Sequence, residues 1–234
     1  MGYKYELHLH TAEVSRCAEC SAAGQVEVYR RLGYTGICIT DHFFGGSNSI
    51  PPDIPWEEKI HRLASGYENA KKAAEGTELD VFFGWEYTLG GGSDFLILGL
   101  DVDWLLHYPD QLAWKAQDYF SRVQADGGYV IHAHPFAEAK FIECIRLFPR
   151  HVDAVEVING ARALEINQRA VQYAESYGLL MTGGTDAHSD KQTNMCGIEV
   201  PYECHTIADI IQAIRNGDAK PISETQMELL SKHE

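Results

Sequence analysis

The sequence is short of positive charge and has no long apolar run. Its 234 residues contain 19 lysines and arginines against 34 aspartates and glutamates, a formal net charge of −15 at pH 7. Such a charge repels nucleic-acid backbones and anionic membranes, so we expect neither as a partner. Because no segment is apolar over the length of a transmembrane helix and no signal-peptide pattern follows Met1, the sequence predicts a cytoplasmic protein.

The sequence also lacks a linker. No segment rich in proline, glycine or serine divides it, and its composition, 45% hydrophobic and 23% charged, is that of an ordinary globular protein. A chain of this length can bury one sizeable core. We therefore expect residues 1–234 to form a single domain.

Strand and helix patterns alternate along the chain. Short apolar runs and a period of two predict strands at 5–11, 36–40, 79–86, 95–99, 129–131, 154–158, 179–182 and 197–201. Helical periods predict helices at 22–32, 56–75, 112–125, 141–148, 163–177 and 206–216, whereas 43–55 is a loop and the tail 221–234 has the pattern of a short amphipathic helix. This alternation predicts a parallel sheet with helical crossovers.

Ionisable side chains gather where the predicted strands end. His8 and His10 lie two residues apart in a strand and therefore point to one face. Neutral imidazoles arranged in this way suit a divalent transition metal. Six of the eleven histidines and two carboxylates occupy such positions. They are His8, His10, His42, His132, His134 and His188, with Glu86 and Asp186. Since a closed barrel brings many strand ends to one site, this pattern favours a barrel of about seven strands over an open sheet.

These motifs and their order resemble the PHP (polymerase and histidinol phosphatase) family of metal-dependent hydrolases. The resemblance spans about residues 3 to 190 and rests on His8-x-His10, Thr40-Asp41-His42, Glu86, His134-Pro135 and Asp186-x-His188. It implies a distorted (β/α)7 TIM-like barrel that holds two or three divalent metal ions (Zn, Mn or Fe) and acts on phosphate esters.

The resemblance also implies which residues hold the metals. It assigns His8, His10, Glu86 and Asp186 to a first ion. A second ion shares Glu86 and takes His134, and a third takes His42 and His188.

Two ligands that many members carry have no counterpart in this sequence. No imidazole precedes Leu98-Gly99 on the strand after Glu86, and we expect His132 to replace it or to lie behind the metals. Neither Ser15 nor Arg16 supplies the usual third-site ligand, which leaves Glu13 or Cys17 as substitutes.

The cysteines are expected to be free thiols. Cys17 and Cys20 form a Cys-x-x-Cys pair, but no second pair completes a four-thiolate zinc site. We favour a loop thiol near the metals over a redox pair or a structural zinc site. Cys38 and Cys144 lie in apolar patterns and are expected in the core.

The expected mechanism is hydrolysis of a small phosphorylated substrate by a hydroxide that bridges two metals. Glu86 and Asp186 hold the metals, and His188 or His42 protonates the leaving alkoxide. Asp41 is expected to orient a histidine from behind. Arg162, Asn159 and Arg16 are candidates for substrate contacts.

Two alternatives stay open. Some relatives place an arginine directly after His-Pro-Phe, where this chain has Ala137, so an amidohydrolase-like enzyme that cleaves C–N or C–O bonds remains possible. A non-catalytic module stabilised by its metals is the other. The sequence does not define the substrate, the choice between monoester and diester, the native metal or the oligomeric state.

Overall fold

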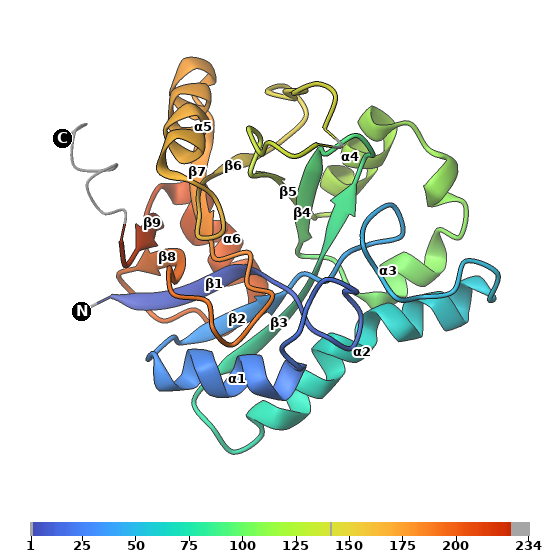
Figure 1. The fold of residues 1–234 in the computed structure, drawn as a ribbon, viewed down its shortest axis with the longest axis horizontal. Coiled ribbons are helices and arrows are strands. Elements are labelled where there is room, and N and C mark those ends of the chain that lie inside the picture. Colours follow the sequence, from blue (N-terminus) through green and yellow to red (C-terminus); the bar gives the residue numbers. More distant parts are fainter. Residues whose placement is uncertain (1, 141, 226–234) are drawn as a thin grey trace.

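A mixed β-sheet curls into a barrel in the computed structural model, which describes residues 2–140 and 142–225 (Figure 1). Its strands are β1 (Tyr3–Leu9), β2 (Gly36–Ile39), β3 (Asp80–Thr88), β4 (Asp94–Leu98), β5 (Tyr129–Ala133), β6 (Ala154–Asn159), β7 (Leu180–Gly184), β8 (Cys196–Val200) and β9 (Lys220–Ser223). The order across the sheet is β7-β6-β5-β4-β3-β2-β1-β8-β9.

The sheet is not purely parallel, contrary to the prediction. β4 runs antiparallel to both β3 and β5, and β8 runs antiparallel to both β1 and β9. The connection from β3 to β4 contains Gly90, Gly91 and Gly92, all with positive φ. Such a tight turn reverses the chain and is far too short for the crossover that parallel neighbours need. The described residues therefore form nine strands, where about seven parallel ones were expected.

The barrel closes between β1 and the segment that follows β7. The Asp186 N–H donates to the His8 carbonyl at 2.8 Å, and the His10 N–H donates to the Ala187 carbonyl at 2.9 Å. Glu6, which is fully buried, accepts hydrogen bonds from the backbone N–H of Thr185 at 2.9 Å and from the Tyr29 hydroxyl at 2.8 Å. The predicted barrel-like fold is thus confirmed.

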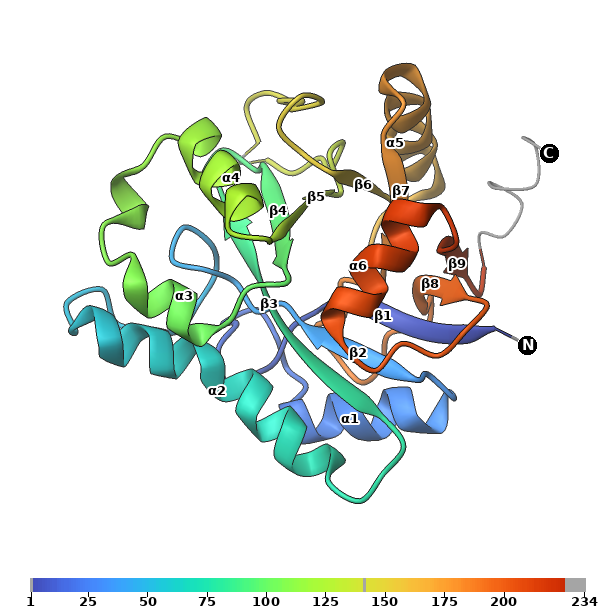
Figure 2. The same ribbon diagram turned by 180° about the vertical axis from the view of Figure 1, so that it is seen from behind.

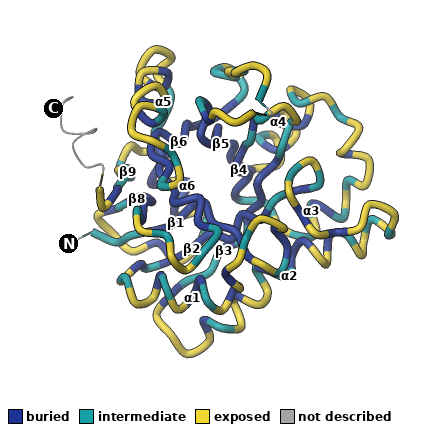
Figure 3. The backbone as a smooth tube through the Cα atoms, viewed as in Figure 1, coloured by how far each residue is buried: buried dark blue, intermediate teal, exposed yellow. Residues whose placement is uncertain are grey.

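Helices cover the outside of the barrel and one of its ends. They are α1 (Ala22–Arg31), α2 (Trp56–Ala74), α3 (Val102–His107), α4 (Ala116–Ala125), α5 (Leu164–Tyr177) and α6 (Ile207–Asn216), with a 3-10 turn at Gln111–Ala113. α6 lies across the barrel end away from the predicted metal ligands, and its Ile210 and Ile214 pack with Leu98 and Ile131 (Figure 2). The strands are largely buried while the helices expose their outer faces (Figure 3). The polar cluster at the opposite end of the barrel therefore lies above this packed apolar core.

The predicted helix at 141–148 is wrong, since the described residues 142–148 form no helix. Ile145 and Leu147 are exposed, so an apolar helix face there would have no partner. Instead the Arg146 guanidinium donates to the Gly90 carbonyl in the β3–β4 turn. Cys144 is exposed rather than in the core, whereas Cys38 is buried as predicted.

Two short elements escaped prediction. α3 follows β4 directly, and its cap is Asp101, whose carboxylate accepts from the Trp104 N–H. β9 lies at the start of the predicted tail. The helical pattern proposed for the tail otherwise falls on residues 226–234, outside the described residues. No helix in the described part of the chain has the length and apolarity to span a membrane.

Candidate metal centre

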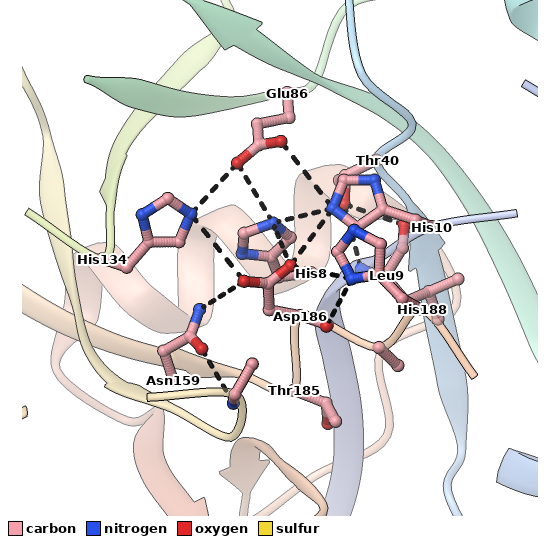
Figure 4. A network of polar contacts seen from close by, with 12 residues as sticks. His8, Leu9, His10, Thr40, Glu86, His134, Asn159, Thr185, Asp186 and His188 are labelled. Carbon is pink, nitrogen blue, oxygen red and sulfur yellow. Dashed lines mark hydrogen bonds and ion pairs between the residues drawn. The ribbon is translucent and has the colours of Figure 1, made fainter. Parts of the chain in front are cut away.

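Four side chains converge at the open end of the barrel from β1, β3 and the segment after β7 (Figure 4). His8 Nε2 lies 3.2 Å from His10 Nε2, 3.3 Å from Glu86 Oε1 and 3.6 Å from Asp186 Oδ1. His10 Nε2 lies 3.4 Å from Asp186 Oδ1. The side chains of all four are at most 4% exposed. These are the four residues predicted to hold a first metal ion.

The spacing of these atoms fits a metal ion. Ligands about 2.0–2.1 Å from a tetrahedral zinc ion lie roughly 3.3 Å apart, close to the separations found among the four side chains. Two imidazole nitrogens that face each other gain little from one another but can share a cation. In addition, Glu86 Oε2 and His42 Nδ1 lie 2.5 Å apart, and neither atom has a hydrogen bond to any other group among the described residues. The residues present therefore suit a divalent metal.

A second group surrounds the other side of Glu86. His134 Nε2 lies 3.2 Å from Glu86 Oε1 and 3.9 Å from Asp186 Oδ2. Asp94 joins them, since ligand atoms of Glu86, Asp94 and His134 all lie within 4.8 Å of one another. In the β3–β4 hairpin Asp94 pairs with Thr88 and Leu96 pairs with Glu86, so Asp94 and Glu86 share a face. Sequence reasoning missed Asp94, which begins the strand on which an imidazole was sought just before Leu98-Gly99.

A third group is the most open of the three. His10, His42 and His188 offer nitrogens within 4.8 Å of one another, and the His10 ring lies between the other two at centroid distances of 4.2 and 4.3 Å. The side chains of His42 and His188 are 15% and 28% exposed. Cys17 Sγ lies 3.2 Å from His42 Nε2, as expected of a loop thiol near the metals. Burial raises the pKa of this thiol, but hydrogen bonds from His188 and His42 outweigh burial and lower it to about 6.

His132 does not reach this centre. Its ring stacks on Phe95, its cross-strand partner, at a centroid distance of 4.7 Å and also packs near Phe148 and Tyr173. Strict alternation would place His132 and His134 on the same face, but His134 has a φ of 28°, which turns its side chain inward. The expectation that His132 replaces a missing ligand is therefore wrong, and Asp94 lies beside Glu86 and His134 instead.

Strain marks two of the candidate ligands. His134 and Asp186, with φ values of 28° and 55°, are the non-glycine residues with positive φ among the described residues. Each such conformation costs on the order of 1–3 kcal/mol and tends to persist at functional sites. The barrel holds both side chains in place against this cost.

A buried layer of polar groups orients the first ligands. Glu156 Oε1 lies 2.9 Å from His8 Nδ1, which directs His8 Nε2 toward the centre. Glu156 Oε2 accepts from the His134 N–H and from Asn159 Nδ2, both at 2.9 Å. Asn159 is fully buried and also lies 3.4 Å from Asp186 Oδ2, so its place favours positioning of ligands over the substrate contact predicted for it.

Asp41 acts on His10 through Ser15. The Asp41 carboxylate accepts from the Thr11 N–H and from the hydroxyls of Thr11 and Ser15, each at 2.7 Å. The Ser15 hydroxyl in turn lies 3.2 Å from His10 Nδ1. The predicted support of a histidine by Asp41 is thus relayed rather than direct.

The two arginines proposed for substrate contact lie apart. Arg162 Nη2 is 3.2 Å from Asp186 Oδ2, and the side chain is 32% exposed at the rim of the centre. Arg16 is exposed on the loop after β1, where its backbone N–H donates to the Ser47 carbonyl. Of the two, Arg162 is the one that contacts a candidate metal ligand.

The charges of the centre call for a cation. Burial by itself disfavours the ionised carboxylates, yet the surrounding histidines hold the pKa of Glu86 and of Asp186 well below the ordinary range. Burial likewise opposes protonation of His8, but Glu156 and Asp186 raise its pKa well above the usual value. Burial and the charge of His42 together lower the pKa of His10 to about 3. Imidazolium groups here neutralise carboxylates that a metal ion would neutralise more strongly.

Fold and site together define an α/β barrel domain with a buried multi-histidine, multi-carboxylate centre. A family model described as PHP-associated matches residues 165–219. With the motifs at the strand ends, this match supports the predicted resemblance to the PHP family. An uncharacterized protein of Methanocaldococcus jannaschii is 39% identical over 75 residues, 29% of this chain and 32% of that protein. The chain thus spans about a third of the length of this curated relative.

Several solved structures share the fold at low sequence identity. A two-domain protein from Bacteroides vulgatus containing a predicted PHP-like metal-dependent phosphoesterase is 17% identical, with a TM-score of 0.71 over 95% of this chain and 65% of that one. An amidohydrolase from Chromobacterium violaceum is 14% identical, with a TM-score of 0.55 over 90% and 96%. Endonuclease Q in complex with a 27-mer duplex substrate is 12% identical, with a TM-score of 0.62 over 94% and 58%.

The endonuclease complex corrects one prediction. The expectation of a small phosphorylated substrate with no nucleic acid is contradicted, because endonuclease Q holds a duplex with an abasic lesion at the active site of this same fold. The prediction relied on the net charge of the whole molecule. Metal ions and neighbouring side chains set the potential at the reacting group, and they can reverse it locally.

Proposed function

We propose that this chain is a metal-dependent phosphoesterase that hydrolyses a phosphate ester at a centre of two or three divalent metal ions. The observation that carries the proposal is Glu86, whose two carboxylate oxygens face four histidines. Oε1 lies 3.3 Å from His8 and 3.2 Å from His134, and Oε2 faces His42 and lies 3.7 Å from His10. A carboxylate placed in this way can bridge adjacent metals, the arrangement that phosphoryl-transfer sites with two metals use.

The bound metals would lower the pKa of a water molecule and stabilise the charge that develops on the phosphoryl oxygens. Glu86 and Asp186 orient the cluster, and Glu156 holds His8 so that Nε2 points inward. Arg162 lies at the rim beside Asp186, where its guanidinium can donate to a phosphate oxygen. His188 Nδ1 lies 2.9 Å from the Asp186 carbonyl, which keeps the proton on that nitrogen.

Phosphorus chemistry is favoured over amide chemistry by the cationic rim. Some relatives hold phosphate with an arginine directly after His-Pro-Phe, where this chain has Ala137. Arg162 can take this role, because its guanidinium lies at the rim of the centre. Because an amidohydrolase shares the fold, the test also includes substrates with C–N and C–O bonds. The shared fold of endonuclease Q brings oligonucleotides into it.

The test pairs metal content with hydrolysis. Protein prepared without chelators is measured by elemental analysis, then assayed on aryl phosphate mono- and diesters, single- and double-stranded oligonucleotides, and aryl amides and lactones. Wild type and Asp118→Asn, a change at an exposed position of α4, should bind two or three metals and release phosphate or cleave the oligonucleotide. Asp186→Asn should lose metal and reduce hydrolysis to background.

Two outcomes would overturn the proposal. Full metal loading without cleavage of any phosphate ester would point to a metal-stabilised module. Turnover of amides or lactones with no phosphate ester cleaved would assign the centre to the amidohydrolase alternative.

A further inference from the structure

The third group is one protein ligand short, because one of its three histidines, His10, also belongs to the first group. His10 Nε2 faces His8 and Asp186 in the first group, and its Nδ1 lies 3.2 Å from the Ser15 hydroxyl. Both nitrogens of His10 are therefore engaged, which leaves His42 and His188. Two imidazoles seldom hold a transition metal alone, because protein sites for such metals commonly provide three side chains and leave one position open.

The loop after β1 delivers a thiol to this place. Its ends are joined by the hydrogen bond from the Ala12 N–H to the Cys20 carbonyl at 2.8 Å. On one side the Glu19 N–H donates to the His188 carbonyl at 2.7 Å. On the other, the Arg16 N–H donates to Ser47, in the loop that follows His42, at 2.8 Å. These hydrogen bonds hold the loop against the segment that carries His188 and the segment that follows His42. Cys17 lies between the two residues that donate them.

The geometry of Cys17 suits a ligand. Its Sγ lies 3.2 Å from His42 Nε2, near the separation of about 3.5 Å between a sulfur and a nitrogen bound to one zinc ion. The other nitrogen of His42 is already engaged. Glu86 Oε2, on a side chain only 1% exposed, lies 2.5 Å from Nδ1 of the same ring. Nε2, beside Cys17, is therefore the nitrogen that His42 offers to a third cation, and His188 offers a further nitrogen in the same group.

We propose that Cys17 is a thiolate ligand which, with His42 and His188, completes a third metal site. A soft sulfur ligand selects zinc, iron or cobalt over manganese, so the third site would differ from the nitrogen- and oxygen-lined sites beside it. The inference rests on the proposed function for the presence of metals, but it concerns the composition of one site and not the reaction.

Cobalt spectroscopy tests the proposal without relying on turnover. Metal-free protein is titrated with Co²⁺, and absorption is followed in the near ultraviolet, where sulfur-to-cobalt charge transfer appears, and in the visible region. Wild type and Cys144→Ser, which removes the other exposed thiol, should develop the charge-transfer band as the third equivalent binds. Cys17→Ser should lack the band and bind one fewer Zn²⁺ per chain.

Alkylation provides a second measurement on the unmodified chain. Iodoacetamide followed by peptide mass spectrometry should label Cys17 in metal-free protein, and zinc should suppress this labelling at least tenfold. Cys144 is exposed and should react equally in both states. Equal labelling of Cys17 with and without zinc would overturn the proposal.

The results separate this inference from the proposed function. Phosphate release together with three bound cobalt ions and no charge-transfer band would reject the thiolate ligand and leave the phosphoesterase standing. A charge-transfer band that Cys17→Ser abolishes, with no hydrolysis of any ester, would confirm the ligand and reject the phosphoesterase.

Discussion

Individual side chains at this centre are set by the direction of the strand that carries them. Histidines at the ends of parallel strands could be recognised from the sequence, because parallel strands bring their carboxyl ends to one edge. Asp94 could not, since it begins a strand rather than ending one. β4 is antiparallel to β3, so the start of β4 lies at the same edge as the end of β3. The sequence signal that was available is the glycine-rich turn, which is too short for a parallel crossover.

Asp94→Asn tests whether this residue binds the second metal. The amide keeps the size of the side chain but loses the charge. Loss of a group that only orients a metal ligand lowers metal affinity by roughly 10- to 100-fold. Loss of a direct ligand should lower the affinity for one metal at least as much. Affinity for the first metal should stay within about twofold. Isothermal titration of metal-free protein with Mn²⁺ measures both values. Asp118→Asn is the matched control, and an unchanged titration for Asp94→Asn would remove Asp94 from the site.

At the scale of elements, the sequence predicted where strands and helices lie better than how they pair. Helices such as α5 and α6 carry clear caps: Gly178 ends α5 in the left-handed conformation, and Thr206 with Asp209 forms a capping box before α6. Pairing depends on contacts between distant segments, which no local pattern records. The same holds for His132, because the backbone twist at His134 that separates the two side chains comes from tertiary packing.

The closing seam between β1 and β7 contains a buried carboxyl group with a strong pH signature. Burial raises the pKa of Glu6 to about 7, although hydrogen bonds from Thr185, His8 and Tyr29 oppose the rise. Between about pH 4.5 and 7, the Glu6 carboxyl therefore keeps its proton in the folded protein. In the unfolded chain, where its pKa is the ordinary 4.5, it has lost this proton. This group's contribution to stability is full below about pH 4.5 and is lost as pH rises toward 7.

Replacing the carboxyl by an amide should remove this dependence. We expect Glu6→Gln to be less stable than wild type at pH 5, because the hydrogen bonds fit an amide less well. The difference in unfolding free energy should then shift in favour of the variant by roughly 2.5 kcal/mol between pH 5 and pH 8. Urea unfolding of both proteins in chelator, at pH 5, 6, 7 and 8, gives the comparison. A difference that stays constant across this range would contradict the assignment.

For the whole molecule, net charge and local charge act over different distances. The net charge of −15 is a long-range property, screened beyond about 10 Å at 0.1 M salt. The candidate metal centre would act at short range, through the cations that it binds and the guanidinium of Arg162. A nucleic acid would therefore be attracted at one phosphate and repelled along the rest of its length, which reverses the usual salt dependence of nucleic-acid binding.

This balance can be measured by competition, whether or not the oligonucleotide is cleaved. A 20-nucleotide single strand and a dinucleotide are compared as inhibitors of aryl phosphate hydrolysis by metal-loaded protein in 10 and 150 mM salt. At the lower salt the Debye length is about 30 Å, so the long strand feels the acidic surface and should bind several-fold more weakly than at the higher salt. The dinucleotide lies almost wholly within the reach of the metals and should respond far less. If the long strand instead binds more tightly at low salt, as it does to basic proteins, a positively charged track must lead from the centre across the acidic surface.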